Sequence, residues 1–413
     1  MKAYLSLENI KNSTAEIAVT GSKSESNRLL VLQALYPNLT IENVSESDDS
    51  VVLSKGVKIK NGVVDIHHAG TAMRFLTAYF AGQDGVEITL TGSARMQERP
   101  IGVLVDALRN LGAQIEYLSE EGYPPIKIVG RRLEEKSVTV AANISSQYIS
   151  ALMLLAPSLE HGLRLQLKGK VTSEPYIQMT LALLQRIGIE GSYTDNEIAI
   201  SASETIENTI ITVESDWSSA SYFYSVVALS NDTNIQLTSY RKDSLQGDAA
   251  LSQIYTAFGV HTEFDELQQT IFLSKNETEL PESIALDLSN TPDIAQTIAV
   301  TCFGLGKACV LSGLHTLKIK ETDRLLALET ELTKLGAEVT VTNDSLTLKS
   351  TNQIIPNVEI ATYHDHRMAM AFAPLGLKTP IVIKDCGVVS KSFPSFWKDI
   401  VKIGINVQLK QEN

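Results

Sequence analysis

Apolar and polar positions along the chain follow one recurring order: an amphipathic helical segment, a glycine, and a strand of alternating apolar and polar residues. The helical part is clear in VLVDALRNL (103–111) and RLLALETELTKL (324–335), where apolar residues recur three and four positions apart. A glycine directly after such a helix predicts a left-handed residue that ends it. These glycines are 56 to 77 residues apart, at Gly56, Gly112, Gly188, Gly259, Gly336 and Gly404.

A second, more apolar helix recurs in the same frame and carries polar residues at its start. The expected starts are 46 to 75 residues apart, near Ser24, Gly70, Ser145, Ser218, Pro292 and Asp365. The two series predict six copies of a βαβα-type unit of roughly 70 residues. The first interval is short in both series, so we expect one unit, around residues 40–66, to be shortened.

Three such units per domain agree with ordinary domain size. We expect an N-terminal domain at 20–214 and a discontinuous second domain at 1–19 plus 215–413, each with three units. The chain would cross between them near Val19–Gly21 and Val213–Trp217. Two similar lobes of this kind predict a cleft between them.

Composition and charge exclude several classes of protein. The 413 residues carry 48 acidic and 35 basic side chains, a net charge of −13, which argues against a nucleic-acid partner. Cys302, Cys309 and Cys386 form no CxxC pair, which argues against a disulfide framework and a thiolate metal site. The first residues, MKAYLSLENIKNSTAEIAV, show no signal core, and no apolar stretch is long enough to span a bilayer. We therefore expect a cytoplasmic protein without a membrane partner.

Basic residues gather near the starts of the apolar helices, beside Gly, Ser and Thr. Helix N-termini attract anions, and small residues let an anion approach the backbone closely. GSKS at 21–24 lacks the spacing of a P-loop, so nucleotide binding does not follow. The pattern predicts several anionic groups bound at once. The residues concerned are Lys23, Ser24, Arg28, Arg74, Arg95, Arg99, Lys320, Arg324, Arg367 and Lys391.

Two carboxylates stand among these cations: Asp293 in PDIAQT and Glu321 in KETDR. Fixed positive charge lowers the pKa of a carboxyl group, which can then accept a proton from a substrate hydroxyl. A plain first-turn acid is the alternative for Asp293. His364 and His366 are two residues apart with no third ligand nearby, so we expect no metal site. From the residues alone, a transferase of phosphorylated substrates and an anion-binding protein both remain open.

Taken together, the motifs resemble the enolpyruvyl transferase family and, within it, the EPSP synthases (3-phosphoshikimate 1-carboxyvinyltransferases). The resemblance covers nearly the whole chain and implies a two-lobed inside-out α/β (α+β) barrel of six βαβαββ units, three per domain, with the first unit shortened. The matching segments are GSKSESNR (21–28), AGTAMR (69–74), GSARMQERPIG (92–102), SSQY (145–148), SEPYI (173–177), SDWSSASY (215–222), TPDIAQT (291–297), KETDR (320–324), DHRMAM (365–370) and KSFP (391–394).

The resemblance implies transfer of the enolpyruvyl group of phosphoenolpyruvate to the 5-hydroxyl of 3-phosphoshikimate with release of phosphate. This is a step of the shikimate pathway towards chorismate and the aromatic amino acids. The reaction is an addition followed by an elimination, without a cofactor and without a covalent enzyme adduct. Binding groups from both lobes imply a closing motion, and a monomer is the default expectation.

The family's site residues carry over to matching positions of this chain. Asp293 would take the hydroxyl proton, and Glu321 and Lys23 are candidates for proton transfer at the methylene carbon of phosphoenolpyruvate. The positions implied for 3-phosphoshikimate are Lys23, Ser24, Arg28, Ser145, Ser146, Gln147, Ser173, Tyr176, Asp293 and Lys320. The positions implied for phosphoenolpyruvate are Lys23, Gly70, Arg95, Gln147, Arg324, Arg367 and Lys391.

The chain departs from the family's pattern at His68 (usually Asn), Phe75 (often Pro) and Thr316 (Asn in some members), and 48–67 is shortened by roughly 20 residues. Two alternatives remain. One is the sister transferase acting on UDP-N-acetylglucosamine, although its mobile loop typically carries a Cys that GSARMQERP lacks. The other is a non-catalytic anion-binding homologue, which the shortened unit and His68 would favour.

Overall fold

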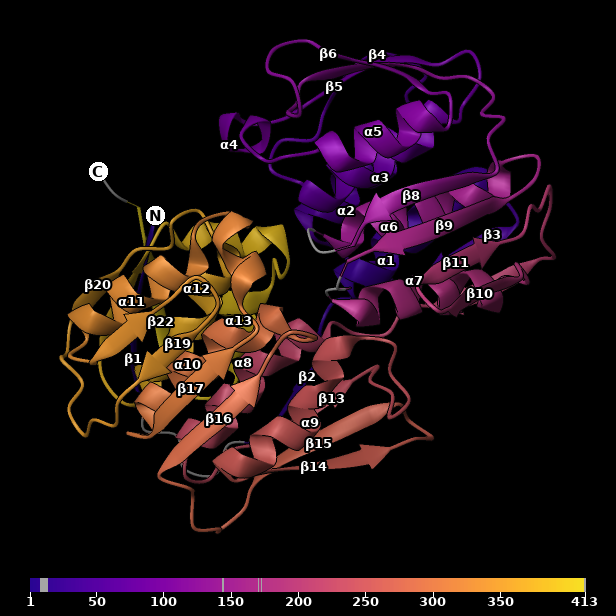
Figure 1. The fold of residues 1–413 in the computed structure, drawn as a ribbon. Helices are drawn as coiled ribbons and strands as arrows, with labels where there is room; N and C mark the ends of the chain where they lie inside the picture. The colour runs from indigo at the N-terminus through magenta and orange to yellow at the C-terminus, as the bar shows by residue number, and fades with distance from the viewer. Residues whose placement is uncertain (8–13, 143–144, 170, 172, 412–413) are drawn as a thin grey trace. The chain divides into compact units, whose positions relative to one another are not determined.

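The computed structural model describes residues 1–7, 14–142, 145–169, 171 and 173–411. The chain forms two compact units, coloured by residue number in Figure 1. The continuous unit is residues 21–213, and the discontinuous unit is residues 1–20 with 214–413. Each contains three modules built from helices and one small sheet per module.

Two modules of the continuous unit have the full order strand, helix, strand, helix, hairpin. In each, the first two strands pair in parallel and the hairpin adds antiparallel strands, giving the orders β4-β5-β7-β6 and β10-β11-β9-β8. The first module comprises β4 (Asn61–Asp65), α3 (Gly70–Ala81), β5 (Glu87–Thr91), α4 (Ala94–Gln97), α5 (Gly102–Asn110), β6 (Gln114–Tyr117) and β7 (Ile126–Val129). The second comprises β8 (Ser137–Ala141), α6 (Ser146–Leu155), η1 (Ala156–Ser158), β9 (Leu163–Lys168), α7 (Glu174–Arg186), β10 (Gly191–Thr194) and β11 (Glu197–Ile200).

The third module of this unit lacks the hairpin. It consists of β12 (Thr209–Thr212), α1 (Lys23–Leu35), β3 (Leu39–Glu42) and α2 (Asp48–Gly56), and its sheet is the parallel pair of β12 and β3. Residues 57–60, all of which the structure describes, lead from α2 into β4 without a further strand. The predicted shortening is confirmed, and the part removed is the hairpin.

The absence of this hairpin corrects one expectation, the left-handed residue at Gly56. Gly56 is the last residue of α2, and Val57 after it is still right-handed. A methyl group on Gly56 would lie 2.8 Å from Cδ1 of Leu76 in α3, so glycine here permits close helix packing. The left-handed conformation is confirmed at the five glycines that precede hairpin strands, Gly112, Gly188, Gly259, Gly336 and Gly404.

The discontinuous unit holds three full modules with the same strand pairing. One comprises β16 (Ser283–Asp287), η4 (Pro292–Ile294), α10 (Ala295–Gly304), β17 (Ala308–Ser312), η5 (His315–Ile319), α11 (Arg324–Lys334), β18 (Val339–Val341) and β19 (Leu346–Leu348). The next comprises β20 (Val358–Ile360), α12 (His366–Phe372), η6 (Ala373–Leu377), β21 (Ile381–Lys384), η7 (Cys386–Lys391), α13 (Phe396–Val401), β22 (Ile405–Lys410) and β1 (Lys2–Leu7). The last comprises β2 (Thr14–Ile17), α8 (Trp217–Leu229), β13 (Asn234–Thr238), η2 (Gly247–Ala250), α9 (Leu251–Ile254), η3 (Tyr255–Phe258), β14 (Val260–Asp265) and β15 (Thr270–Lys275).

Two strands from the start of the chain complete sheets of this unit. β1 lies between β21 and β22, antiparallel to both, and buries the alternate residues Ala3 and Leu5. β2 runs parallel to β13 and buries Ala15 and Ile17. Because each strand fills a place in a sheet that is otherwise built from residues after 213, the unit must be discontinuous in sequence.

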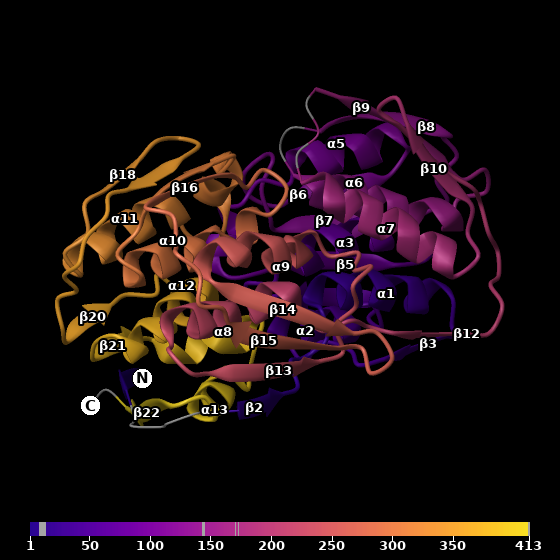
Figure 2. The same ribbon diagram turned by 90° about the horizontal axis from the view of Figure 1, so that it is seen from below.

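The more apolar helix of each module forms the interior of its unit (Figure 2). A helix that is apolar all round must be buried: α8 leaves only Ser218 short of full burial, and α10 leaves only Gly304. Five of the six predicted starts of these helices are confirmed to within one residue; at the sixth, Pro292 begins the short η4, and α10 follows three residues later at Ala295. Together with the six modules this confirms the predicted α/β fold. No helix in the described part of the chain is long and apolar enough to cross a membrane.

Candidate functional site

The starts of three central helices meet in the discontinuous unit. Arg367, in the first turn of α12, donates from Nη1 to the backbone oxygen of Asp293 at 3.0 Å and from Nη2 to Oγ of Ser218 at 3.4 Å. Asp293 lies in η4, directly before α10, and Ser218 lies in the first turn of α8. The N-termini of α8, α10 and α12 therefore converge, and their amides and dipoles favour negative charge at this point.

Asp293 lies at the centre of a charged cluster. Its Oδ1 is 2.9 Å from Nη1 of Arg324 and 3.6 Å from Nζ of Lys320, and its Oδ2 is 3.2 Å from Nη2 of Arg367. Burial raises the pKa of Asp293, but the three cations outweigh burial and hold its pKa well below the usual value. The expectation that neighbouring cations lower the pKa of this carboxyl is confirmed.

Arg324 binds two further carboxylates of the cluster. Its Nη2 is 2.9 Å from Oε2 of Glu321, and its Nε is 2.7 Å from Oδ2 of Asp365. The side chain is only 2 % exposed. Burial opposes its charge, yet the carboxylates of Asp365, Glu321 and Asp293 raise the pKa of Arg324 above the ordinary value. The arginine therefore stays charged and joins the starts of α11 and α12 to the carboxylate in η4.

Lys391 belongs to the same group of elements. It ends η7, and its Nζ donates to the backbone oxygen of His364 at 2.7 Å. His364 directly precedes Asp365, which caps α12 by accepting from the backbone N–H of Arg367 at 2.9 Å. The structure thus groups all the site residues predicted in this unit: Asp293, Lys320, Glu321, Arg324, Arg367 and Lys391.

Asp248 extends the cluster and is a residue that the sequence analysis missed. Its carboxylate accepts a hydrogen bond from Ser218, which also contacts Arg367. Burial, followed by the charge of Asp293, raises the pKa of Asp248 to about 7. A single acid in SLQGDAA carries no sequence signal, since only the fold brings η2 to the start of α8.

In the continuous unit Arg28 connects three helices. It donates from Nη1 to the backbone oxygen of Ser24 at 2.8 Å, from Nε to Oγ1 of Thr180 at 2.7 Å and from Nη2 to Oγ of Ser150 at 2.9 Å. Its guanidinium also lies over the ring of Tyr176, 5.7 Å from the centroid. Burial lowers the pKa of Arg28 to about 10. The residue therefore fixes the starts of α1 and α7 on α6.

The starts of α3 and α6 are also neighbours. Ser145 caps α6 by accepting from the N–H of Gln147 at 3.3 Å, and Nε2 of Gln147 donates to Oγ1 of Thr71 in α3 at 3.3 Å. Ser173 precedes α7 in a left-handed conformation, with φ 54°. All the predicted residues of this unit except Arg95 lie within the first two turns of α1, α3, α6 or α7 or directly before one of these helices. The full set is Lys23, Ser24, Arg28, Gly70, Arg95, Ser145, Ser146, Gln147, Ser173 and Tyr176.

Arg74 and Arg95 differ in their surroundings. Arg74 is buried in α3 and donates to the backbone oxygens of Gly70 at 3.1 Å and Pro100 at 2.9 Å, so it supports the start of the helix. Arg95 lies in α4, with its side chain 48 % exposed, and pairs with Glu98 at 2.9 Å.

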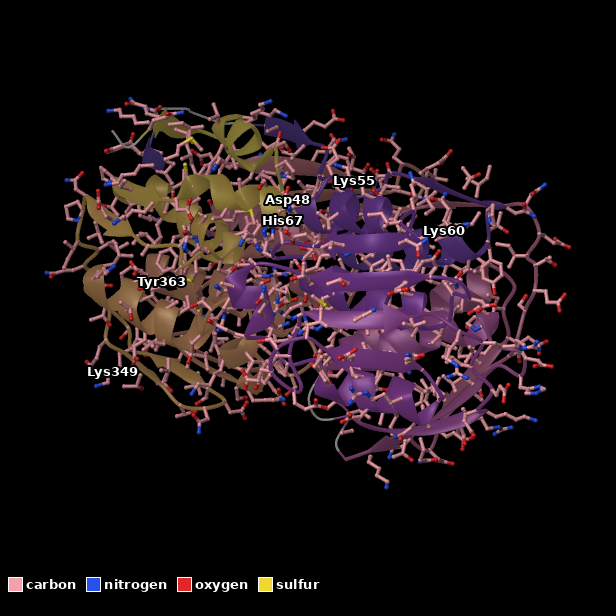
Figure 3. All side chains as sticks on the ribbon, turned by 90° about the horizontal axis from the view of Figure 1, so that it is seen from above. Asp48, Lys55, Lys60, His67, Lys349 and Tyr363 are labelled. Atoms are coloured by element: carbon pink, nitrogen blue, oxygen red, sulfur yellow. The ribbon has the colours of Figure 1, made fainter. Side chains whose placement is uncertain are left out.

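The positions that depart from the family's pattern have defined surroundings. Nε2 of His68 lies 3.6 Å from Oδ2 of Asp48 at the start of α2; Asp48 is labelled in Figure 3. The ring of Phe75 is buried under the guanidinium of Arg28, 5.5 Å from its centroid. Thr316 is buried in η5. Phe75 therefore takes a packing role, while His68 adds a titratable group beside the start of α3.

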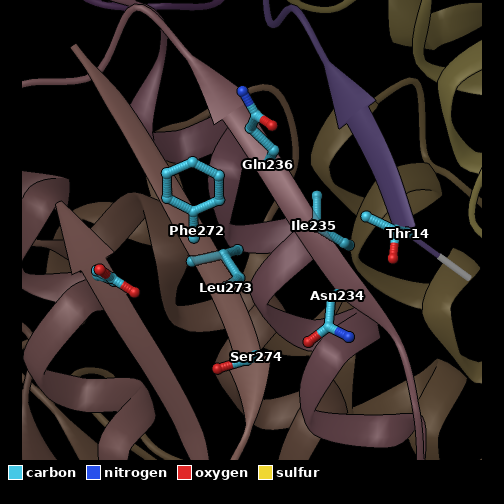
Figure 4. Close-up of a pocket in the computed structure, with 8 residues that line it drawn as sticks. Thr14, Asn234, Ile235, Gln236, Phe272, Leu273 and Ser274 are labelled. Carbon is cyan, nitrogen blue, oxygen red and sulfur yellow. The ribbon is translucent and has the colours of Figure 1, made fainter. Parts of the chain in front are cut away.

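A hollow of about 280 Å³ lies elsewhere, on the sheet β14-β15-β13-β2 (Figure 4). Within the described part of the chain, none of the predicted site residues lines it, and Glu263 is the only ionisable residue of its lining. Its lining is Thr14, Asn234, Ile235, Gln236, Glu263, Phe272, Leu273 and Ser274. These lining residues include no cation, so they offer no charge that would hold an anionic ligand.

Comparisons with known proteins match this chain to one family over most of its length. Residues 37–400 match the family model of EPSP synthase (3-phosphoshikimate 1-carboxyvinyltransferase). A 3-phosphoshikimate 1-carboxyvinyltransferase of Bacteroides fragilis is 44 % identical over 402 residues, covering 96 % of this chain and 97 % of that protein. One from Haemophilus influenzae is 36 % identical over 422 residues, covering 94 % and 96 %.

Solved structures share the fold. An EPSP synthase of Acinetobacter baumannii superimposes with a TM-score of 0.79 at 22 % identity, covering 99 % of this chain and all of that one. The enolpyruvyl transferase NikO of Streptomyces tendae gives 0.73 at 13 % identity, covering 98 % of each chain. The family match and the long alignments at 36 to 44 % identity show more than a common fold. This chain belongs to the EPSP synthase family.

Proposed function

We propose that this chain transfers the enolpyruvyl group of phosphoenolpyruvate to the 5-hydroxyl of 3-phosphoshikimate and releases phosphate. The observation that carries the proposal is the buried cluster in which Asp293 stays ionised between Arg324 and Arg367, in a chain of the EPSP synthase family. Two anionic substrates require fixed cations, and the attacking hydroxyl requires a proton acceptor. The cluster offers both.

In this proposal Asp293 accepts the 5-hydroxyl proton while the hydroxyl oxygen attacks C2 of phosphoenolpyruvate. Glu321 or Lys23 delivers a proton to the methylene carbon, and a tetrahedral intermediate results. Phosphate then leaves C2, and the carbon that was protonated gives a proton back to the same residue. This elimination restores the carbon–carbon double bond of the enolpyruvyl group. The fixed cations stabilise the charge that moves onto the phosphate.

The binding residues are proposed position by position. For 3-phosphoshikimate we propose Lys23, Ser24, Arg28, Ser145, Ser146, Gln147, Ser173, Tyr176, Asp293 and Lys320. For phosphoenolpyruvate we propose Lys23, Gly70, Arg95, Gln147, Arg324, Arg367 and Lys391. Because Arg28 is already hydrogen-bonded to Thr180 and Ser150, its contribution to the first substrate would be mainly to hold Ser24 and Tyr176 in place.

The proposal extends to the protein's setting. We propose that it acts as a cytoplasmic monomer on small-molecule substrates and that its two units are the two domains of the enzyme. All three cysteines are free thiols, as expected in a reducing compartment. Light scattering on the purified protein tests the oligomeric state, because a dimer would double the mass of 45.1 kDa.

The test of the activity is phosphate release from phosphoenolpyruvate on addition of 3-phosphoshikimate, with UDP-N-acetylglucosamine in a parallel reaction. We expect release with 3-phosphoshikimate only. Release with the nucleotide sugar instead would assign the sister reaction. A folded protein that is silent with both would support the non-catalytic homologue.

A further inference from the structure

Asp248 is a buried acid next to the charged cluster, and the proposed reaction leaves it without a role. The residue is 5 % exposed, and its carboxylate accepts a hydrogen bond from the hydroxyl of Ser218 in the first turn of α8. A hydroxyl has one proton, so the oxygen of Ser218 is left to accept, and Nη2 of Arg367 donates to it at 3.4 Å. Asp248 therefore sets the direction of the Ser218 hydroxyl and, through it, supports the position of Arg367.

The guanidinium of Arg367 is held on two sides by groups of this unit. On one side, Nη1 donates to the backbone oxygen of Asp293 at 3.0 Å, and Nη2 lies 3.2 Å from Oδ2 of the same residue. On the other side Nη2 reaches Ser218, which Asp248 orients. A substrate anion must replace some of these acceptors, and it does so more easily when less negative charge surrounds the guanidinium.

The groups that face Asp248 make its charge depend on pH. Arg367 in α12 and the hydroxyl of Ser218 in α8 favour the ionised form. Burial, the charge of Asp293 in η4 and the charge of Asp216 at the N-cap of α8 favour the neutral form. The second set outweighs the first, so the pKa of Asp248 is about 7. The negative charge around Arg367 therefore increases between pH 6 and pH 8.

We propose that Asp248 is a positioning residue of the site: its carboxylate holds Arg367 back through Ser218, and its neutral form releases Arg367 to phosphoenolpyruvate. Ionisation strengthens the bond from Ser218 and polarises this hydroxyl towards the guanidinium. A carboxylate at position 248 would also repel the anionic substrate. A proton on Asp248 and the substrate therefore favour each other's binding. The identity of the ligand rests on the proposed function, whereas the chain of contacts rests on the geometry.

The pH dependence of KM for phosphoenolpyruvate tests this role. The protonated fraction of Asp248 falls from about nine tenths at pH 6 to about one tenth at pH 8. If only this fraction binds well, KM of the wild type should rise about tenfold over the range. Asp248→Asn, which is neutral at any pH, should remove most of this rise. The substrate's own phosphate titrates equally in both proteins, so the difference between their profiles reports Asp248.

Two further variants separate this role from a structural one. Asp399→Asn is the matched control, because Asp399 in α13 is also 5 % exposed and accepts from Oγ of Ser395 at 2.7 Å. It should be less stable and keep the wild-type pH profile. Ser218→Ala removes the bond that favours the carboxylate, so the rise in KM should move to higher pH. If Asp248→Asn keeps the wild-type rise, or raises KM for both substrates equally at every pH, Asp248 is only structural and the proposal is overturned.

Calorimetry with phosphoenolpyruvate alone measures the linked proton without turnover. At pH 7.5, in buffers of different ionisation enthalpy, the wild type should take up about half a proton more on binding than Asp248→Asn does. Equal uptake by the two proteins would overturn the proposal. If the wild type releases no phosphate but its proton uptake still depends on Asp248, the role of Asp248 in binding stands and the proposed function fails. A protein that neither turns over nor binds phosphoenolpyruvate would overturn both.

Discussion

Single residues of the charged cluster are already paired in the absence of a ligand. Asp293 forms ion pairs with Arg324 and Arg367. These are the same cations that we propose to bind phosphoenolpyruvate. The substrate anion must therefore compete with this carboxylate. As it takes over the arginines, the pKa of Asp293 should rise towards the range of a useful base.

Asp293→Asn separates binding from proton transfer at this residue. The amide keeps the side-chain shape but removes the competing charge, so phosphoenolpyruvate should bind as tightly as before or more tightly. Turnover should fall about 10²- to 10⁴-fold, the usual contribution of a general base. Calorimetry with 3-phosphoshikimate present and steady-state kinetics measure the two effects. A parallel loss of binding and kcat would contradict the base role.

Asp248 predicts how stability depends on pH. Its pKa is about 7 in the folded chain against an ordinary value of 3.8. Between these values the folded state keeps a proton that the unfolded state has released. This stabilising contribution is therefore complete below about pH 4 and is lost as pH rises through about 7. From pH 5 to 8 the wild type should lose more stability than Asp248→Asn in urea denaturation. If the difference in free energy of unfolding between the two proteins stays constant from pH 5 to 8, the raised pKa of Asp248 is contradicted.

Sequence reasoning reached only some of these residues. Asp293, Arg324 and Arg367 lie at helix starts within motifs, so their grouping followed from the repeat and the family pattern. Asp248 is in no such motif, and only the fold brings it to Ser218 at the start of α8 and buries it there. Arg99 was visible as one basic residue among several, but that its buried Nε has no hydrogen-bond partner among the described residues is a property of the packed structure.

At the scale of elements, α11 holds the loop before α12 at two points. Arg324, its first residue, binds Asp365. Two turns later the buried Glu331 accepts from the hydroxyl of Tyr363 at 2.6 Å and from the N–H of Ala361 at 3.2 Å. Residues seven apart share a helix face, so one face of α11 binds the whole loop. Tyr363 is labelled in Figure 3.

This loop needs such support because its backbone is strained. Tyr363 and His364 both have positive φ, 53° and 55°, which costs roughly 1–3 kcal/mol for each bulky residue. The strained turn places the His364 oxygen on Nζ of Lys391 and Asp365 on Arg324. The hydrogen bond from the Tyr363 hydroxyl to Glu331, which holds this loop on α11, can therefore affect the cations of the site.

Tyr363→Phe removes the hydrogen bond from the Tyr363 hydroxyl to Glu331 but keeps the aromatic ring. We expect KM for phosphoenolpyruvate to rise several-fold while KM for 3-phosphoshikimate changes little, because the loop serves Lys391 and Arg367. Tyr36→Phe is the control: it also removes one hydroxyl bond, to Ser203 at 2.8 Å, but in the continuous unit. If KM for phosphoenolpyruvate is the same in both variants, whatever their Tm, the hydrogen bond between Tyr363 and Glu331 has only a structural role.

Gly56 gives a second test at the scale of elements. Alanine normally improves a helix by about 1 kcal/mol over glycine. Here its methyl group would press on Leu76, and overpacking costs typically about 1–3 kcal/mol. Gly56→Ala should therefore lower the denaturation midpoint, while alanine at the exposed Lys55 on the same helix should leave it nearly unchanged. If Gly56→Ala is more stable than the wild type, Leu76 and α3 can shift enough to accommodate the methyl group at little cost.

The repeat shows which features of elements can be predicted from sequence. Glycines before hairpins and polar starts of buried helices are local signals, and the structure confirms them at Gly112 and Gly70. Gly56 looks the same in sequence but ends a helix with no hairpin after it. The reason for glycine at position 56 is its packing against Leu76, which lies twenty residues further along the chain. A local sequence pattern does not reveal such a contact.

At the scale of the whole molecule, the chain passes between its units at 20–21 and 213–214. On one side, Val213 donates to the backbone oxygen of Glu42 at 3.0 Å and accepts from Nδ2 of Asn43 at 2.8 Å. On the other, buried Glu214 accepts from Nε1 of Trp217 at 2.7 Å and from Oγ of Ser244 at 2.6 Å. At the 213–214 crossing the chain is therefore hydrogen-bonded up to the connecting peptide on both sides.

Ligand-dependent movement follows from the proposed binding residues. Lys23 and Gln147 belong to the continuous unit, whereas Arg324 and Lys391 belong to the discontinuous one, yet all four are proposed to contact phosphoenolpyruvate. A small ligand held by both groups must restrain the units relative to one another. We therefore expect solution X-ray scattering to show a smaller radius of gyration with 3-phosphoshikimate and phosphoenolpyruvate than without ligands. Inorganic phosphate alone serves as the control for ionic effects. Identical profiles in an active protein would mean that no closure accompanies binding, and that the residues of one unit must suffice to hold each substrate.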